Sequence, residues 1–167
     1  MNIKLGIPLI ASIFAGCSTS VPPDAPSGAH VDPALGGRPA ERVETTRDAT
    51  STATTLAGYK HDLAHRISQV NSTKVYIDRP QALLRSVVVL KYQVDGDGNL
   101  VRSEIFRSNR DRETESTALA TLKKTAPFPK PPAHLLRHGH VDILESWLFN
   151  NDGRFQLRTI ALPQMDR

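Results

Sequence analysis

Acidic residues in one short glycine-rich stretch are the first candidates for chemistry in this sequence. Asp95, Asp97 and Asn99 alternate with glycine, in the order that begins a calcium-binding loop. Such a loop also needs glycine at its sixth position and a bidentate glutamate at its twelfth, where this chain has Leu100 and Phe106. Residues that tolerate positive φ between two apolar runs are instead typical of a β-hairpin. The stretch therefore predicts a hairpin turn and no metal site.

Other patterns that could support catalysis or ligand binding are weak. His134, His138 and His140 follow a proline-rich stretch and have no carboxylate at ligand spacing, so we expect ordinary loop histidines. No serine lies in a G-x-S-x-G elbow, and no phosphate loop of the G-x-x-x-x-G-K type occurs. The sequence thus predicts no enzyme, no cofactor and no metal, and an enzyme of unrecognised type is a minor alternative.

The N-terminal residues resemble the signal of a bacterial lipoprotein. Lys4 precedes an apolar run, residues 5–14, that has about half the ~20 residues needed to span a bilayer. The run leads into FAGC, which is similar to a lipobox and ends at Cys17, the single cysteine. We therefore expect residues 1–16 to be a signal peptide and Cys17 to carry acyl chains such as palmitate, which would anchor the protein. An ordinary cleaved signal that leaves a free thiol is the alternative.

The residues after the cysteine predict a tether and then one folded domain. Ser18 follows Cys17, as in lipoproteins sent to the outer membrane, so we expect an outer-membrane anchor and a domain in the periplasm. Residues 17–54 are rich in Pro, Gly, Ser, Thr and Ala and contain no aromatic residue. Such a segment cannot bury enough apolar surface to offset the entropy of ordering, so we predict a disordered tether. The domain is expected at residues 55–167.

Hydrophobic periodicity predicts an α+β domain with a small antiparallel sheet of three to four strands and two helices packed on one face. Apolar residues recur at helical spacing in two segments, and alternate with a period of two in four others. The predicted helices are residues 55–70 and 113–125, and the predicted strands are residues 87–94, 100–107, 141–149 and 155–162.

The order of these segments is similar to the C-terminal domain of the TonB family, a TonB/TolA-like periplasmic module. The matching features are a strand, the turn DGDGN, a second strand, Ser108 and Asn109, an Ala- and Leu-containing helix, and the segment APFPKPP at residues 126–132. The resemblance implies a domain that binds the extended segment of an outer-membrane transporter by strand addition. Energy transducers of that family also cross the inner membrane and couple to ExbB-type and ExbD-type partners. A lipoprotein signal stands here instead, so we do not expect energy transduction.

Strand addition needs an exposed sheet edge. Because a tight hairpin joins the first two strands, we expect the third or fourth strand to provide that edge, and the basic helix face to be the next surface to test. The candidate partner-binding residues are Val141, Ile143, Trp147, Phe155 and Leu157 in the strands, with Lys123 and Lys124 on the helix.

Positive charge defines the remaining expectations about partners. The chain has a net charge of +4, and the basic excess falls in the predicted domain. A basic surface can meet an acidic envelope protein, peptidoglycan carboxylates or anionic lipid, or simply be solvated. Nucleic acid is not expected, since the sequence has neither an RNA-binding aromatic pair nor a zinc finger. The leading hypothesis is a lipid-anchored adaptor that binds an envelope protein. The alternatives are a structural subunit of a secretion or pilus machine and a TonB-family component of a transport system.

Overall fold

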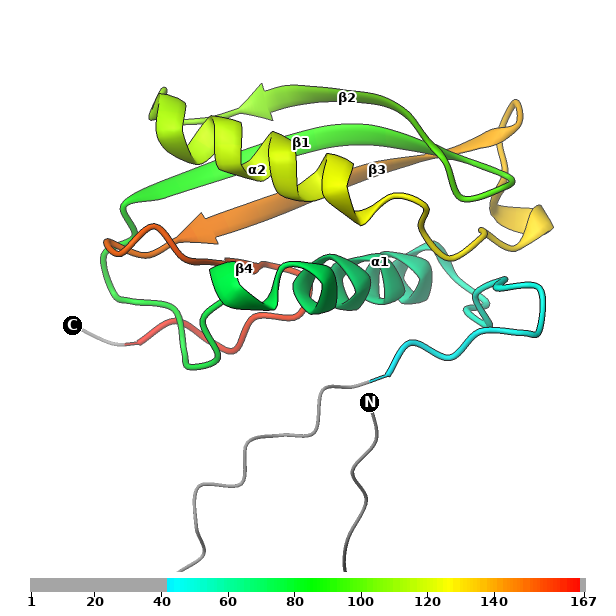
Figure 1. Ribbon diagram of the computed structural model, residues 1–167, viewed down its shortest axis with the longest axis horizontal. Coiled ribbons are helices and arrows are strands. Elements are labelled where there is room, and N and C mark those ends of the chain that lie inside the picture. The colour runs from blue at the N-terminus through cyan, green and yellow to red at the C-terminus, as the bar shows by residue number, and fades with distance from the viewer. Residues whose placement is uncertain (1–41, 166–167) are drawn as a thin grey trace, which may run out of the picture. The chain divides into compact units, whose positions relative to one another are not determined.

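A computed structural model describes residues 42–165 of the chain. The predicted signal peptide and the predicted lipidation site, Cys17, lie outside these residues. Two helices and four strands make up the domain, with two short 3-10 helices between them (Figure 1). In chain order the elements are α1 (Leu56–Val70), η1 (Ser72–Lys74), β1 (Ser86–Asp95), β2 (Leu100–Arg107), α2 (Arg112–Thr125), η2 (Ala133–Leu135), β3 (His140–Phe149) and β4 (Phe155–Leu157).

The four strands form one antiparallel sheet in the order β2-β1-β3-β4. Both helices pack against it, so the predicted α+β fold is confirmed (Figure 1). The bounds of β2 match the prediction, and those of α1, α2, β1 and β3 differ from it by one residue. Only the fourth strand is much shorter than predicted. It ends at Leu157 because the chain turns there, with the amides of Ile160 and Ala161 bonded to the Leu157 carbonyl.

The core lies between the sheet and the helices. Alternate residues of β1, from Val88 to Val94, are almost fully buried, and they pack with Leu63 of α1 and Leu122 of α2. Trp147 of β3 is also fully buried, and its indole N–H donates to the hydroxyl of Thr121 at 3.2 Å. The period-two alternation of the strands therefore sets which face the helices cover.

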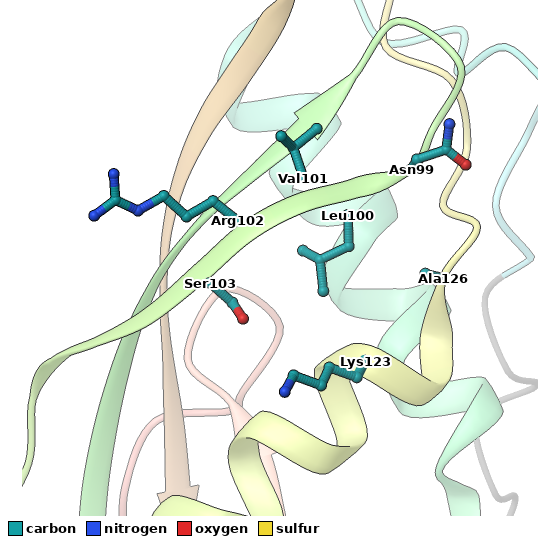
Figure 2. Close-up of a pocket in the computed structure, with 7 residues that line it drawn as sticks. All are labelled: Asn99, Leu100, Val101, Arg102, Ser103, Lys123 and Ala126. Carbon is teal, nitrogen blue, oxygen red and sulfur yellow. The ribbon is translucent and has the colours of Figure 1, made fainter.

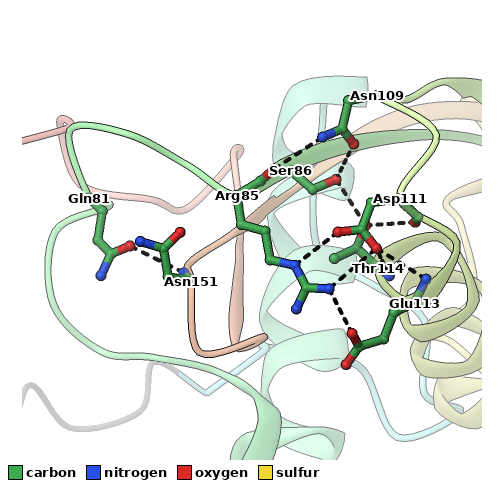
Figure 3. A network of polar contacts seen from close by, with 8 residues as sticks. All are labelled: Gln81, Arg85, Ser86, Asn109, Asp111, Glu113, Thr114 and Asn151. Atoms are coloured by element: carbon green, nitrogen blue, oxygen red, sulfur yellow. Dashed lines mark hydrogen bonds and ion pairs between the residues drawn. The ribbon is translucent and has the colours of Figure 1, made fainter.

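A polar network fixes the start of α2 (Figure 3). Asp111 is the N-cap residue, and its carboxylate accepts hydrogen bonds from the amides of Glu113 and Thr114. Arg85, which precedes β1, donates to Asp111 at 2.8 Å and to Glu113 at 2.6 Å. Ser86 of β1 links to the same turn, because it accepts a hydrogen bond from the Thr114 hydroxyl at 2.9 Å. The helix is thereby held at one end of the sheet.

The proline-rich segment after α2 fixes the opposite end. The amide of Phe128 donates to the carbonyl of Gly98 in the β1–β2 turn at 2.8 Å. Gly98 has φ +86°, and a Cβ there would lie 2.2 Å from the Phe128 carbonyl oxygen, so only glycine fits. The ring of Phe128 stacks on Tyr92 of β1, with 6.1 Å between centroids. The segment thus attaches the hairpin to the end of the helix.

Part of the predicted tether belongs to the domain. The amide of Ser51 donates to the Lys130 carbonyl, and the amide of Lys130 donates to the Ala49 carbonyl, both at 2.9 Å. Ser51 is buried, and its hydroxyl donates to the carboxylate of Asp62 in α1. Residues 49–54 therefore pack on the domain, which begins before the predicted boundary at residue 55.

Candidate functional site

The strand order decides which edge of the sheet is available to a partner. β3 pairs with β1 along its whole length, but β4 covers its other side only at Trp147–Phe149. Residues 141–145 of the third strand therefore keep an outer side that no strand in the described chain pairs with. The sequence could not reveal this, since hairpin spacing says which strands are neighbours but not which strand ends the sheet. β2 and β4 are the outermost strands, and the part of β3 that extends beyond β4 is also an edge.

The edge at β4 is short and covered. β4 has three residues, all buried, and Val75 lies beside Phe155 in a parallel bridge. The amide of Tyr76 donates to the Phe155 carbonyl at 3.3 Å. The side-chain amide of Gln156 donates to the carbonyls of Tyr76 and Asp78 at 2.7 and 2.6 Å. The chain's own backbone therefore occupies the place that an added strand would take.

Tyr76 reinforces this cover. Its ring is buried, and its hydroxyl donates to the carbonyl of Leu148 at 3.3 Å. Burial, with a smaller effect of Asp152, raises the pKa of Tyr76 to about 12, as expected for a hydroxyl held away from water.

The side chains predicted to bind a partner divide into two groups. Five are buried in the core and offer no surface, while two on α2 are exposed, although only Lys123 lines the groove described below. The buried residues are Val141, Ile143, Trp147, Phe155 and Leu157, and the exposed residues are Lys123 and Lys124.

The edge at β2 is open. β2 has eight residues, and no strand within residues 42–165 pairs with its outer side. Three of its apolar side chains are exposed, at 59% for Val101, 38% for Ile105 and 63% for Phe106. This combination of an unpaired backbone edge and exposed apolar side chains marks β2 as the candidate docking surface.

Alternation identifies the backbone groups that are free. The amide of Asp95 donates to the Asn99 carbonyl across the hairpin, so Gln93 and Lys91, two and four residues earlier, also direct their backbone groups toward β2. Their partners in β2 are Arg102 and Glu104. Backbone direction alternates along a strand, so Ser103, between the two partners, and Ile105, after the second one, direct their N–H and C=O groups away from the sheet.

Two β-bulges shape this edge. The register with β1 shifts between Gln93 and Val94 and again between Val89 and Leu90, which leaves Val101 and Phe106 as the extra residues in β2. Bulges bend and twist a strand locally and interrupt its regular pairing. The regular part of the edge is therefore the stretch from Arg102 to Ile105.

A groove of about 440 Å³ lies between β2 and the C-terminal end of α2 (Figure 2). Leu100 and Ser103 point toward the helix, whereas Val101 and Arg102 point away from it. The strand register supports these orientations. Leu100 and Ser103 pair with Val94 and Tyr92 of β1, whose buried side chains face the helices. The lining residues are Asn99, Leu100, Val101, Arg102, Ser103, Lys123 and Ala126.

Candidate metal ligands in the described region have other partners. Asp95 accepts hydrogen bonds from the amides of Asp97 and Asn99 and from the Asn99 side chain, at 2.8 to 3.0 Å. The Asn99 side chain, followed by the backbone amides of the turn, lowers the pKa of Asp95. These bonds confirm the predicted hairpin turn.

The prediction of loop histidines is wrong for His140, which is the first residue of β3, whereas His134 lies in the short helix η2 and His138 in a turn. His134 contacts the carbonyl of Thr54 at 3.0 Å, His140 contacts the side-chain amide of Gln93 at 3.1 Å, and His138 is exposed in the turn before β3. Within residues 42–165 no three potential metal ligands gather.

Within that same part of the chain, no helix is long and apolar enough to cross a membrane. Comparisons of the chain with family models, with curated proteins and with solved structures found no match.

Proposed function

We propose that this protein is an envelope adaptor, anchored to the outer membrane through Cys17, whose periplasmic domain binds an extended segment of another envelope protein along β2. The open edge of β2 carries this proposal. It combines free backbone groups at Ser103 and Ile105 with exposed apolar side chains at Val101 and Phe106. Main-chain hydrogen bonds supply the affinity of strand addition, and alternate side chains supply its specificity.

The arrangement of the domain supports docking at this edge. β4 is closed by Val75 and Tyr76. In the described region, residues 141–145 of β3 also lie at an unpaired edge, but β2 is the edge that carries the groove and three exposed apolar side chains. The resemblance of residues 87–132 to TonB-family domains supports the same mode of binding. The lipoprotein-type signal supports a position beside the membrane and an adaptor rather than an energy transducer.

Site-specific photo-crosslinking in intact cells tests the proposal. A photoreactive residue at Ser103 should form an adduct of defined mass, whereas the same residue at Asp78, beside the closed edge, should not. Proline at position 105 removes an outward-facing amide and should abolish the Ser103 adduct, because proline has no N–H to donate. Ile105→Val keeps the amide and is the matched control.

Variants must first be shown to fold by cooperative thermal melting. If the folded Ile105→Pro protein still forms the Ser103 adduct at the level of Ile105→Val, strand addition at β2 is wrong.

A further inference from the structure

We propose that the segment bound along β2 carries an acidic side chain, which enters the groove between β2 and α2 and pairs with Lys123. This inference rests on the proposed function and adds the chemistry of the ligand. The occupant is an internal extended segment of an envelope protein, with the pattern apolar–x–acidic–x–apolar.

The charge of the groove favours an acidic occupant. No lining residue is acidic, and two of them, Arg102 and Lys123, are cations. Arg102 points away from α2 and pairs with Glu104 at 2.9 Å, so its charge is already balanced. The side-chain ammonium of Lys123 makes no ion pair or hydrogen bond with any residue in the described part of the chain. It is therefore the groove cation whose charge a ligand can balance.

Nearby cations and carboxylates have other partners. Lys130, beyond the end of α2, lies 3.8 Å from Asp97. Glu115, near the start of α2, accepts a hydrogen bond from Ser108. Neither contact involves Lys123, which extends from the last turn of α2 along the groove (Figure 2).

Strand geometry predicts where the acidic residue would stand. Side chains of an added strand alternate between the two faces of the sheet, and those on the helix face enter the groove. Ser103 lies on that face, between the apolar residues Leu100 and Ile105. A carboxylate opposite Ser103 would meet the Ser103 hydroxyl and the Lys123 ammonium. Apolar side chains two residues before and after it would contact Leu100 and Ile105.

Selection from a displayed library of random octapeptides tests this inference. The full chain, kept in mild detergent, is the bait, and Lys123→Glu is a second bait. We expect wild-type protein to enrich Asp or Glu at one position between apolar residues. The reversed charge should replace that preference with Lys or Arg, because complementary charge sets partner choice.

The affinity of one selected peptide then measures the strength of the proposed ion pair between Lys123 and the peptide's acidic residue. With both peptide ends blocked, Lys123→Ala should weaken binding about fivefold at low salt, and replacement of the peptide's acidic residue by its amide should weaken it equally. Lys124→Ala is the matched control, since this neighbouring lysine does not line the groove, and it should change binding less than twofold.

The possible failures are distinguishable. If selected peptides show no acidic preference but lose binding to the folded Ile105→Pro protein, the acidic ligand is wrong and strand addition stands. If the acidic group proves to be a free C-terminal carboxylate, the internal segment is wrong. If neither bait enriches any peptide, or if Ile105→Pro binds normally, both proposals fail.

Discussion

The two edges of the sheet differ in length, cover and chemistry. β4 has three buried residues, and its outer side is bonded to the backbone of Val75 and Tyr76. β2 has eight residues, is unpaired on its outer side within the described chain, and exposes Val101 and Phe106. Edge strands invite unwanted pairing, and proteins usually cover or interrupt them. The domain covers one edge with its own chain, and interrupts the other with two bulges without closing it.

The largest expected difference between the edges is in stability. Phe155 of β4 is fully buried and lies between Trp147 and Phe149, with ring centroids 6.4 and 5.7 Å away. Phe155→Ala should lower the free energy of unfolding by about 3–5 kcal/mol, through lost burial and a new cavity. Phe106→Ala, at the exposed position of β2, should change it by less than about 0.5 kcal/mol. Chemical denaturation followed by circular dichroism measures both, and equal losses would contradict the division into closed and open edges.

A smaller effect should follow from loosening the cover on β4. Gln156→Met keeps the length of the side chain but removes the two hydrogen bonds to the carbonyls of Tyr76 and Asp78. We expect a loss of about 1–2 kcal/mol in stability and faster hydrogen exchange at the Tyr76 amide. Gln93→Met, which removes a half-buried side-chain amide that bonds to His140 and Asp142, away from the cover on β4, is the control. Unchanged exchange at Tyr76 would show that Gln156 does not hold the cover in place.

The smallest effect concerns the hairpin that sets the register of β2. The Asn99 side chain, then backbone amides, lowers the pKa of Asp95 below its ordinary value of 3.8. A lowered pKa in the folded state means stability that is present above about pH 4 and is lost as the pH falls through the lowered value. Asp95→Asn should therefore cost less than about 1 kcal/mol at pH 7, and this cost should shrink as the pH falls below about 4. Urea denaturation at several pH values checks this, and a difference in stability that does not shrink as the pH falls would exclude the charge of Asp95 as its cause.

Local sequence patterns predict the helices and strands well, because the formation of each of these elements depends on residues close together in the chain. The alternation in β1 and the glycine-rich turn at Asp95 are sufficient to predict a hairpin. The helical spacing of Leu63 and Ile67 is likewise sufficient for α1. These features need no knowledge of distant contacts.

The candidate site could not be predicted in the same way, because it depends on pairing between distant segments. Val75 closes β4 across a separation of eighty residues, and nothing in its local sequence indicates a bridge to Phe155. Ser51 was expected in the tether because its neighbours are small and polar, yet its bond to Asp62 lies within the domain. Lys123 alone of the predicted contact residues lines the groove, which forms only when α2 packs beside β2.

The two bulges also limit how long a bound segment would stay. Between them, Ser103 and Ile105 offer only two outward donors and two outward acceptors. At roughly 0.5–1.5 kcal/mol for each hydrogen bond, these contacts barely offset the lost freedom of two associating partners. Dissociation would therefore be fast, and occupancy would depend on local concentration, which the proposed membrane anchor would raise for a partner held near the same membrane. The β2 edge is therefore suited to transient, repeated binding rather than to a permanent complex.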